Sequence, residues 1–305
     1  MKLEVKNLTK SFGEKEVLHG ISFDVEGGKA LGLLGRNGAG KTTTIRIIMD
    51  VFHANSGEIF LDGKRFNPNE HLIGYLPEER GLYPKKKVSE QLVYLGRLRG
   101  LSKAEAKKNT DKWLKRLQVS QYTDVKLETL SKGNQQKVQL ASTLVCEPEI
   151  VILDEPFSGL DPVNSKILQD VVTELIEEGR IVIFSSHQMS YVEEFCEDIA
   201  IINNGEIALL GDIADIKAEY GKNQLIISAV GMGAEELAEK LKTSCEDTLS
   251  VTGIHKDGVI VKNIHELSGN ALIKEVMNAD VEIASFDSYR PSLNDIFVKA
   301  VGGDR

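Results

Sequence analysis

The chain of 305 residues is 41% hydrophobic, which suits two globular domains better than one small domain. Its formal net charge of −9, from 46 acidic and 37 basic side chains, argues against long-range attraction to phosphates, so no nucleic-acid partner is expected. Cys146, Cys196 and Cys245 lie far apart, which excludes a disulfide framework and favours a reducing cytoplasm. No stretch reaches the roughly 18 apolar residues that span a bilayer, so we expect no membrane-spanning segment.

Strands and helices are predicted to alternate along the first two thirds of the chain. Residues 2–6 and 16–25 have the pattern of strands, and residues 30–34 are apolar throughout, as in a strand buried on both faces. A glycine-rich break and a helical segment follow. Residues 149–154 and 180–186 are again short apolar strands, each followed by helical periodicity. This alternation predicts an α/β domain with a mostly parallel sheet.

Two further regions differ from this pattern. Residues 88–146 have helical periodicity throughout and predict a helical subdomain inserted into the sheet domain. From residue 224 the order changes to strand, helix, strand, strand, helix, strand, which is that of a ferredoxin-like α+β unit, and a last amphipathic helix closes the chain. We therefore expect a first domain over residues 1–221 and a second over 222–305.

The segment GRNGAGKT at residues 35–42 has the pattern G-x-x-x-x-G-K-T. Its glycines let the backbone curl so that successive N–H groups point into one concavity, at a helix N-terminus that favours an anion. Lys41 is then expected to neutralise terminal phosphates and Thr42 to offer its hydroxyl to Mg²⁺. A simple turn would use Gly35 and Gly40, but it gives no reason for the lysine and threonine behind them.

A carboxylate pair follows the apolar strand at residues 149–154. Asp154 ends the strand and can reach a metal ion, whereas Glu155 points on to where a nucleophilic water would lie. Taken alone, Asp-Glu-Pro after a strand is also compatible with an ordinary strand boundary. The phosphate loop upstream favours the catalytic interpretation.

A third candidate element is LSKGNQQKV at residues 130–138. Ser131 has the character of a helix N-cap, and Gly133 leaves room for close backbone approach. Lys132 puts a positive charge at a helix N-terminus, where the macrodipole disfavours it, and a bound anion would relieve this conflict. An ordinary capped helix with an exposed lysine is the alternative interpretation.

These segments occur in a characteristic order. GRNGAGKT (35–42), LSKGN (130–134), ILDEP (152–156), SGLD (158–161) and SSH, which ends at His187, resemble the Walker A, signature, Walker B, D-loop and H-loop motifs of ATP-binding cassette (ABC) transporters. The resemblance covers roughly residues 1–215 and implies a P-loop NTPase cassette. The C-terminal region, GYLPEERGLY and PSLNDIF resemble the ATPase subunits of ABC-2-type exporters, which include sodium and drug efflux systems.

The resemblance implies a site for ATP and Mg²⁺ between two copies of the chain. In a two-fold homodimer each ATP would lie between one copy's phosphate loop and the other copy's LSKGN segment. Glu155 would act as the base, and His187 would orient the water and bond the terminal phosphate. The metal-binding residues would be Thr42, Asp154 and Glu78. The nucleotide-binding residues would be Phe12, Gly35, Asn37, Gly38, Gly40, Lys41, Thr42, Thr43, Glu78, Ser131, Gly133, Asn134 and Asp161.

The chain departs from the family pattern at a few positions. Glu78 stands where the family often has a glutamine that touches magnesium and relays its state to the membrane subunit; a carboxylate can still bind the metal but loses the amide donor. Lys132 and Asn134 replace a glycine and a glutamine of the signature. Since asparagine keeps an amide and a lysine suits a phosphate, we expect nucleotide binding to survive.

The function implied is that of an ATPase subunit that powers a separate membrane protein, in an exporter, from the cytoplasmic face of the cell membrane. The contact with that membrane subunit is expected near residues 78–84. An alternative is a soluble cassette protein that acts on ribosomes or DNA. A small phosphate-loop kinase is a third alternative, although it has no use for LSKGN.

Overall fold

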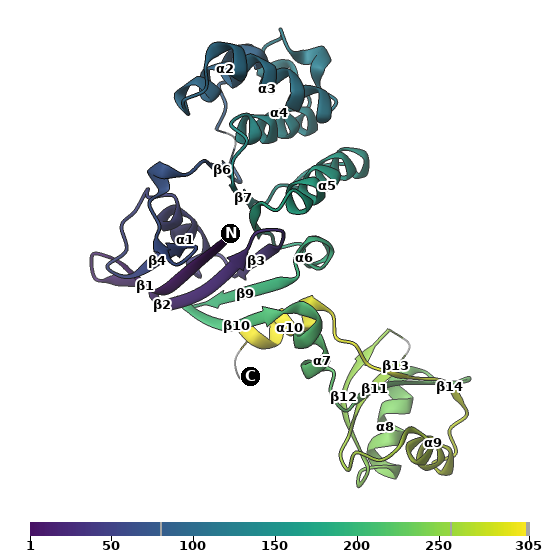
Figure 1. Ribbon diagram of the computed structural model, residues 1–305. Coiled ribbons are helices and arrows are strands. Elements are labelled where there is room, and N and C mark those ends of the chain that lie inside the picture. The colour runs from purple at the N-terminus through teal and green to yellow at the C-terminus, as the bar shows by residue number, and fades with distance from the viewer. Residues whose placement is uncertain (80, 257, 303–305) are drawn as a thin grey trace. The chain divides into compact units, whose positions relative to one another are not determined.

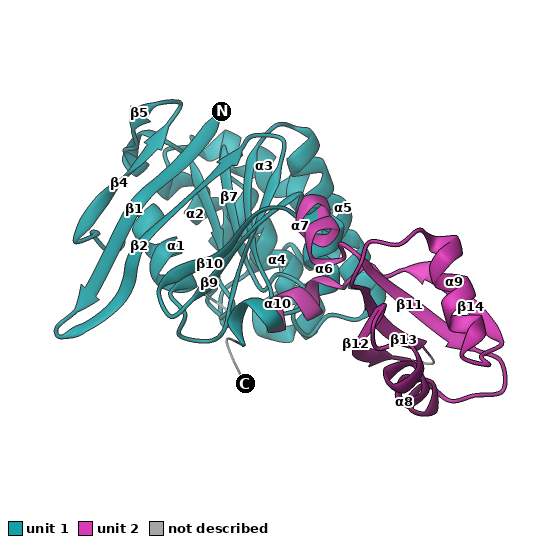
Figure 2. Ribbon diagram, turned by 90° about the horizontal axis from the view of Figure 1, so that it is seen from below, with its two compact units in different colours: residues 1–213, 299–305 teal, residues 214–298 magenta. Residues whose placement is uncertain are grey.

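The computed structural model describes residues 1–79, 81–256 and 258–302, which form two compact units. Unit 1 contains residues 1–213 together with the chain from 299 onwards, and unit 2 contains residues 214–298 (Figure 2). The division after Ile213 lies one helix before the expected one after residue 221. In the sequence, the only sign of a domain boundary here is the glycine that follows this helix. The two units are instead defined by contacts between residues, which place the helix in unit 2.

Unit 1 is built on two sheets. The larger sheet has the order β10-β9-β3-β8-β7-β6, and all its pairs are parallel except the hairpin of β9 and β10 (Figure 1). The smaller, antiparallel sheet has the order β2-β1-β4-β5. The strands are β1 (Lys2–Phe12), β2 (Lys15–Glu26), β3 (Ala30–Gly35), β4 (Ser56–Leu61), β5 (Lys64–Arg65), β6 (Ile73–Leu76), β7 (Ile150–Asp154), β8 (Ile181–Ser185), β9 (Asp198–Asn203) and β10 (Glu206–Asp212).

The central strands form the core because nearly every residue in them is apolar. All of β8, and all but the last residue of β3 and β7, are buried, as predicted from their unbroken apolar sequences. One buried cluster joins side chains of both sheets to Ile45 and Ile48 of α1 (Lys41–Ile48). The other helices of this unit around the sheets are α5 (Pro162–Glu177) and α6 (Met189–Phe195), with the 3-10 turn η1 (Pro68–Glu70).

The region 88–146 forms the predicted helical group. It consists of α2 (Val88–Leu98), α3 (Lys103–Arg116) and α4 (Lys132–Leu144), which pack against one another (Figure 1), with the 3-10 turns η2 (Ser120–Tyr122) and η3 (Leu127–Thr129). A capping box begins α3: Ser102 Oγ accepts from the Glu105 N–H at 3.2 Å, and Glu105 accepts from the Ser102 N–H at 2.9 Å.

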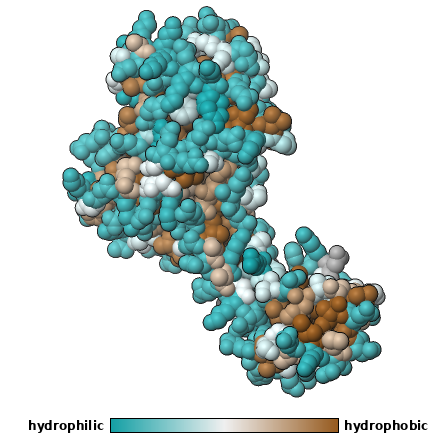
Figure 3. All heavy atoms as spheres, turned by 45° about the vertical axis from the view of Figure 1, so that its right-hand side comes forward, coloured by the Kyte–Doolittle hydropathy of each residue, from teal (hydrophilic) through white to brown (hydrophobic). Residues whose placement is uncertain are grey.

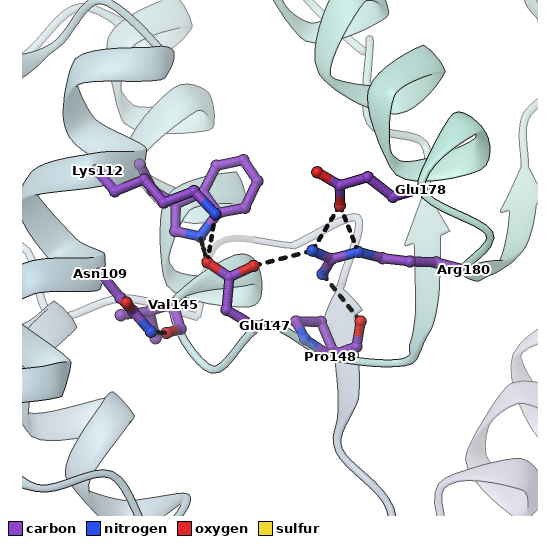
Figure 4. Close-up of polar contacts among 8 residues, drawn as sticks. Asn109, Lys112, Val145, Glu147, Pro148, Glu178 and Arg180 are labelled. Carbon is purple, nitrogen blue, oxygen red and sulfur yellow. Dashed lines mark hydrogen bonds and ion pairs between the residues drawn. The ribbon is translucent and has the colours of Figure 1, made fainter.

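A polar network centred on Glu147 connects this helical group to the sheet (Figure 4). The Glu147 carboxylate accepts hydrogen bonds from Lys112 Nζ at 2.7 Å and Trp113 Nε1 at 3.1 Å, both on α3. From the strand side it accepts one from Arg180 Nη2 at 2.9 Å. Arg180 also donates to the carbonyl oxygen of Pro148 at 2.9 Å, so α3 and the starts of β7 and β8 share one charged network.

Unit 2 has the predicted strand–helix order and forms a sheet of order β12-β13-β11-β14, antiparallel throughout. Its hydrophobic core joins one face of the sheet to α8 and α9. Hydrophobic residues also gather on the visible face of this unit (Figure 3). The elements are α7 (Ile213–Tyr220), β11 (Gln224–Ala229), α8 (Ala234–Ser244), β12 (Leu249–His255), β13 (Gly258–Asn263), α9 (Gly269–Asn278), β14 (Ile283–Ser288) and the start of α10 (Leu293–Val301).

The predicted fold class is confirmed: an α/β cassette with an inserted helical group is followed by a small α+β unit. None of the helices in the described part of the chain combines the length and the hydropathy that a bilayer-spanning segment needs.

Candidate functional site

The loop at residues 35–42 connects β3 to α1 through backbone conformations that require glycine. Gly35 has φ +152°, and a Cβ there would collide with the carbonyl oxygen of Ile202. Gly40, the N-cap of α1, has φ +120°, and a Cβ there would lie 2.5 Å from Leu18 Cδ2. The two glycines therefore let the loop lie against β2 and β9 while the free N–H groups of the α1 N-terminus remain available to an anion.

The Lys41 ammonium folds back over this loop. Its Nζ donates to the carbonyl oxygen of Gly35 at 2.6 Å and to that of Arg36 at 3.3 Å. Burial lowers the pKa of Lys41, although the carboxylates of Asp154, Glu155 and Glu78 act in the opposite direction. Among the described residues the acceptors of this partly desolvated ammonium are backbone carbonyls, so it is well placed to bind a polyanion.

Asp154 lies at the carboxyl end of β7, beside Ser185 at the end of β8. Its Oδ1 accepts a short hydrogen bond from the Ser185 hydroxyl, and its Oδ2 accepts one from the Tyr75 hydroxyl at 3.4 Å. Burial and the neighbouring Asp154 charge raise the pKa of Tyr75 to about 12, so the phenol stays protonated as a donor. Two neighbouring strands thus fix the orientation of the Asp154 carboxylate.

Glu155 has φ +50° and is buried, with 9% of its surface exposed. Its Oε1 accepts from the His187 N–H at 2.7 Å and lies 2.8 Å from His187 Nδ1, while its Oε2 accepts from the Ser186 hydroxyl at 3.1 Å. The left-handed backbone turns the chain directly after Asp154, so the two adjacent carboxylates have separate hydrogen-bond partners.

These groups open into one cavity of about 830 Å³. Most of the predicted site residues line it together, whereas Ser131, Gly133, Asn134 and Asp161 do not. The lining residues are Phe12, Lys15, Val17, Gly35, Arg36, Asn37, Gly38, Gly40, Lys41, Thr42, Thr43, Glu78, Asp154, Glu155, Ser186 and His187.

Sequence reasoning missed Lys15, Val17, Arg36 and Ser186 among these lining residues. Arg36 occupies one of the positions that the G-x-x-x-x-G-K-T pattern leaves unspecified, and Ser186 directly precedes His187. Lys15 and Val17 alternate along β2, so their common face could have been inferred from the strand period once Phe12 was placed.

The four remaining predicted residues lie at the N-termini of α4 and α5. The exposed Ser131 caps α4 by accepting from the Asn134 N–H at 3.3 Å, and Asp161 caps α5 by accepting from the Asn164 N–H at 3.0 Å. The two ends touch, because a Cβ on Gly133 would lie 2.8 Å from Asn164 Nδ2. Lys132 is exposed, as the capped-helix interpretation and the anion interpretation both allow.

The donor set of the cavity fits a magnesium ion bound together with phosphate. Asp154 and Glu78 offer carboxylate oxygens and Thr42 a hydroxyl, which are the hard ligands that Mg²⁺ prefers. No group of three or more His, Cys, Asp or Glu residues in the described ranges could hold a metal ion by itself. An ion here would therefore draw its remaining ligands from phosphate and water.

The segment around Glu78 is held by α4. Gln139 Nε2 on this helix donates to the carbonyl oxygens of Pro77 at 3.3 Å and Glu79 at 3.2 Å. The helix that begins with the signature-like residues therefore contacts the loop in which we expect the membrane subunit to bind. Arg80, part of that expected contact, lies outside the described residues.

Comparison with known proteins gives matches to both units. Residues 18–158 match the family model described as ABC transporter, and residues 211–301 match the C-terminal domain of DrrA1-3-like ATP-binding proteins. YhaQ, an uncharacterized ABC transporter ATP-binding protein of Bacillus subtilis strain 168, is 39% identical over 310 residues, which cover 98% of each chain. The linearmycin resistance ATP-binding protein LnrL of the same strain is 31% identical over 305 residues, with the same coverage.

A solved structure agrees with these matches. It is titled "Structure of ATP binding subunit of ABC transporter" and superposes with a TM-score of 0.67 at 31% identity, over 72% of this chain and 94% of that one. The resemblance inferred from the ordered motifs is confirmed, including its C-terminal accessory domain. The phosphate loop, the carboxylate pair and the near full-length relatives agree: the chain belongs to the ATP-binding proteins of ABC transporters, which are ATPases.

Proposed function

We propose that the chain is the ATP-hydrolysing subunit of an ABC-2-type exporter and works from the cytoplasmic face of the cell membrane. The match of residues 211–301 to the DrrA1-3-like C-terminal domain and the similarity to LnrL support the exporter assignment. The partner would be a separate transmembrane chain. Tyr83 and Tyr94, both exposed beside the loop that α4 holds, offer that chain an aromatic contact.

The observation that carries the proposal is the division of the motif residues into two groups. The phosphate loop, Asp154, Glu155 and His187 line one cavity, whereas Ser131 and Asp161 lie outside it at the ends of other helices. A second copy of the chain in a two-fold arrangement would bring its own Ser131 and Asp161 to this cavity. The site is then complete only in a homodimer.

Within that site the roles follow from the chemistry of each group. The loop amides and Lys41 bind the phosphates, and Phe12 stacks on the adenine. Asp154, Thr42 and Glu78 would hold Mg²⁺, which when bound stabilises the charge that develops on the transferred phosphoryl group. Glu155 accepts the proton of the attacking water, and His187 stands beside it to orient that water.

Glu155→Gln tests this assignment. The amide keeps the size of the side chain but cannot act as a base, so hydrolysis should fall by on the order of 10²- to 10⁴-fold while ATP binding is kept. With Mg-ATP, the variant should elute from a sizing column as a dimer, and wild type without nucleotide as a monomer. Unchanged turnover would refute the role of Glu155. A variant that binds ATP yet stays monomeric at high concentration would refute the shared site.

A further inference from the structure

Phe12 ends β1 at the rim of the nucleotide cavity and is 43% exposed. An exposed ring cannot hold its orientation through core packing, so its neighbours decide how firmly it is held. Its centroid lies 5.2 Å from that of Phe52, with an angle of 75° between the ring planes. This distance and this angle are those of a favourable edge-to-face aromatic pair.

Phe52 is anchored to the helix that carries the phosphate loop. The chain reverses after α1 through Asp50 at φ +58°, and the N–H groups of Val51 and Phe52 both donate to the carbonyl oxygen of Arg46, at 2.8 and 3.2 Å. The Arg46 guanidinium carbon lies 5.6 Å from the centre of the Phe52 ring, and the ring packs partly against the hydrophobic core.

A second support reaches Phe12 from the same short segment. The ammonium of Lys10 lies 5.1 Å over the Phe12 ring and also donates to the carbonyl oxygen of His53 at 2.7 Å. Phe52 and Lys10, which contact the Phe12 ring, are therefore both tied to the segment at residues 52 and 53, which follows α1. The phosphate loop leads into α1, so this helix and the residues directly after it support both the phosphate end and the base end of the nucleotide site.

We propose that Phe52 is a positioning residue for the nucleotide base: it holds the Phe12 ring in the orientation in which a purine stacks on it. This inference rests on the proposed function, because it assumes that Phe12 receives the adenine. Phe52 itself does not line the cavity and acts only through Phe12. Loss of the edge-to-face pair should weaken ATP binding by about two- to tenfold.

The test measures the dissociation constant of Mg-ATP for the full chain by titration calorimetry, in wild type, Phe52→Leu, Phe12→Ala and the double variant. Leucine keeps most of the apolar contact with the core but removes the aromatic edge. Phe52→Tyr, which keeps the ring, should retain wild-type affinity. Phe60→Leu is the matched control. Phe60 lies in β4, which pairs with β1, the strand that Phe12 ends, and its ring lies 4.8 Å from the Lys6 ammonium. It does not line the nucleotide cavity.

We expect Phe52→Leu to lower the affinity for Mg-ATP about two- to tenfold and Phe60→Leu to leave it unchanged. Adding Phe52→Leu to Phe12→Ala should cause no further loss of affinity, since the two residues act as one unit. Inorganic tripolyphosphate, which has no base, should bind wild type and Phe52→Leu equally.

Two outcomes would overturn this inference and leave the proposed function intact. In the first, Phe52→Leu lowers ATP affinity equally in the wild-type chain and in the Phe12→Ala variant. In the second, Phe12→Ala weakens ATP binding but Phe52→Leu does not. Unchanged ATP affinity in Phe12→Ala would instead remove the base contact assumed in the proposed function, and the inference with it.

Discussion

Replacement of Glu147 by glutamine should destabilise the attachment of α3 to the sheet by about 1–2 kcal/mol at pH 7. The carboxylate accepts hydrogen bonds from Lys112, Trp113 and Arg180, and only 12% of the Arg180 side chain is exposed. An amide keeps one acceptor oxygen and loses the charge. This value lies around the lower end of the roughly 1.5–3 kcal/mol typical of charged hydrogen bonds, because the Glu147 side chain is 32% exposed and Arg180 keeps Glu178 as a partner.

The pH dependence of this effect has a definite sign. Burial opposes ionisation of Glu147, but hydrogen bonds and charges from Lys112 and Arg180 outweigh it and lower the pKa below the ordinary 4.5. A carboxyl with a depressed pKa in the folded state contributes stability above its unfolded pKa and loses it as the pH falls through the folded value. The difference between wild type and Glu147→Gln should therefore be constant from pH 7 to 6 and narrow below about 4.5.

The chain provides its own probe for this measurement. Trp113 is the single tryptophan, is 3% exposed, and donates its indole N–H to Glu147 at 3.1 Å, so its fluorescence reports on this network during urea unfolding. Glu128→Gln makes the same chemical change at an exposed carboxylate and should have no effect. A difference of less than about 0.3 kcal/mol at pH 7, or one that grows in acid, would refute the reasoning.

Gly40→Ala should weaken ATP binding by at least about tenfold, because its φ of +120° and the Leu18 side chain 2.5 Å from an added Cβ both oppose the loop conformation; Gly63→Ala, with φ +75° and open space, is the control in the same titration. Ser102→Ala should cost about 1 kcal/mol in thermal unfolding followed by Trp113 fluorescence, because it removes one half of the capping box on α3. An unchanged melting temperature in Ser102→Ala would contradict this contribution of the capping box.

The sequence predicted the elements whose pattern is local. The apolar strands at β3, β7 and β8, the loop before α1 and the ferredoxin-like order of unit 2 all follow from runs of a few residues. It did not predict β4, β5, β6, β9 and β10. The sequence of β9, DIAIIN, is apolar at its centre, but β9 pairs with β3, whose residues lie more than 160 positions earlier, and local patterning does not specify that pairing.

The candidate site also contains residues that a local motif predicts and residues that only the tertiary fold brings together. Motif spacing singled out Lys41, Asp154 and Glu155, because each ends or directly follows a strand or a glycine turn. It could not identify Tyr75, Ser185 or Phe52, whose roles depend on which strands are neighbours and on how the chain reverses after α1. Such supporting residues carry no motif of their own, since a tyrosine or a phenylalanine is equally compatible with a place in the core.

The hydrogen bonds of Glu155 and His187 place a chemical constraint on their proposed roles. A carboxylate offers about four acceptor sites. Glu155 Oε1 accepts from the His187 N–H and Oε2 from the Ser186 hydroxyl, while His187 Nδ1 lies 2.8 Å from Oε1. Within the described residues Oε2 has no other hydrogen-bond partner, so a water can bond there and Glu155 can serve as the proposed base without breaking these contacts. If Nδ1 carries the proton shared with Glu155, a neutral His187 presents Nε2 as an acceptor only. To donate to a terminal phosphate it must become an imidazolium or give up its contact with Glu155. If both residues have their proposed roles, nucleotide binding and the position of the base are linked through a single imidazole ring.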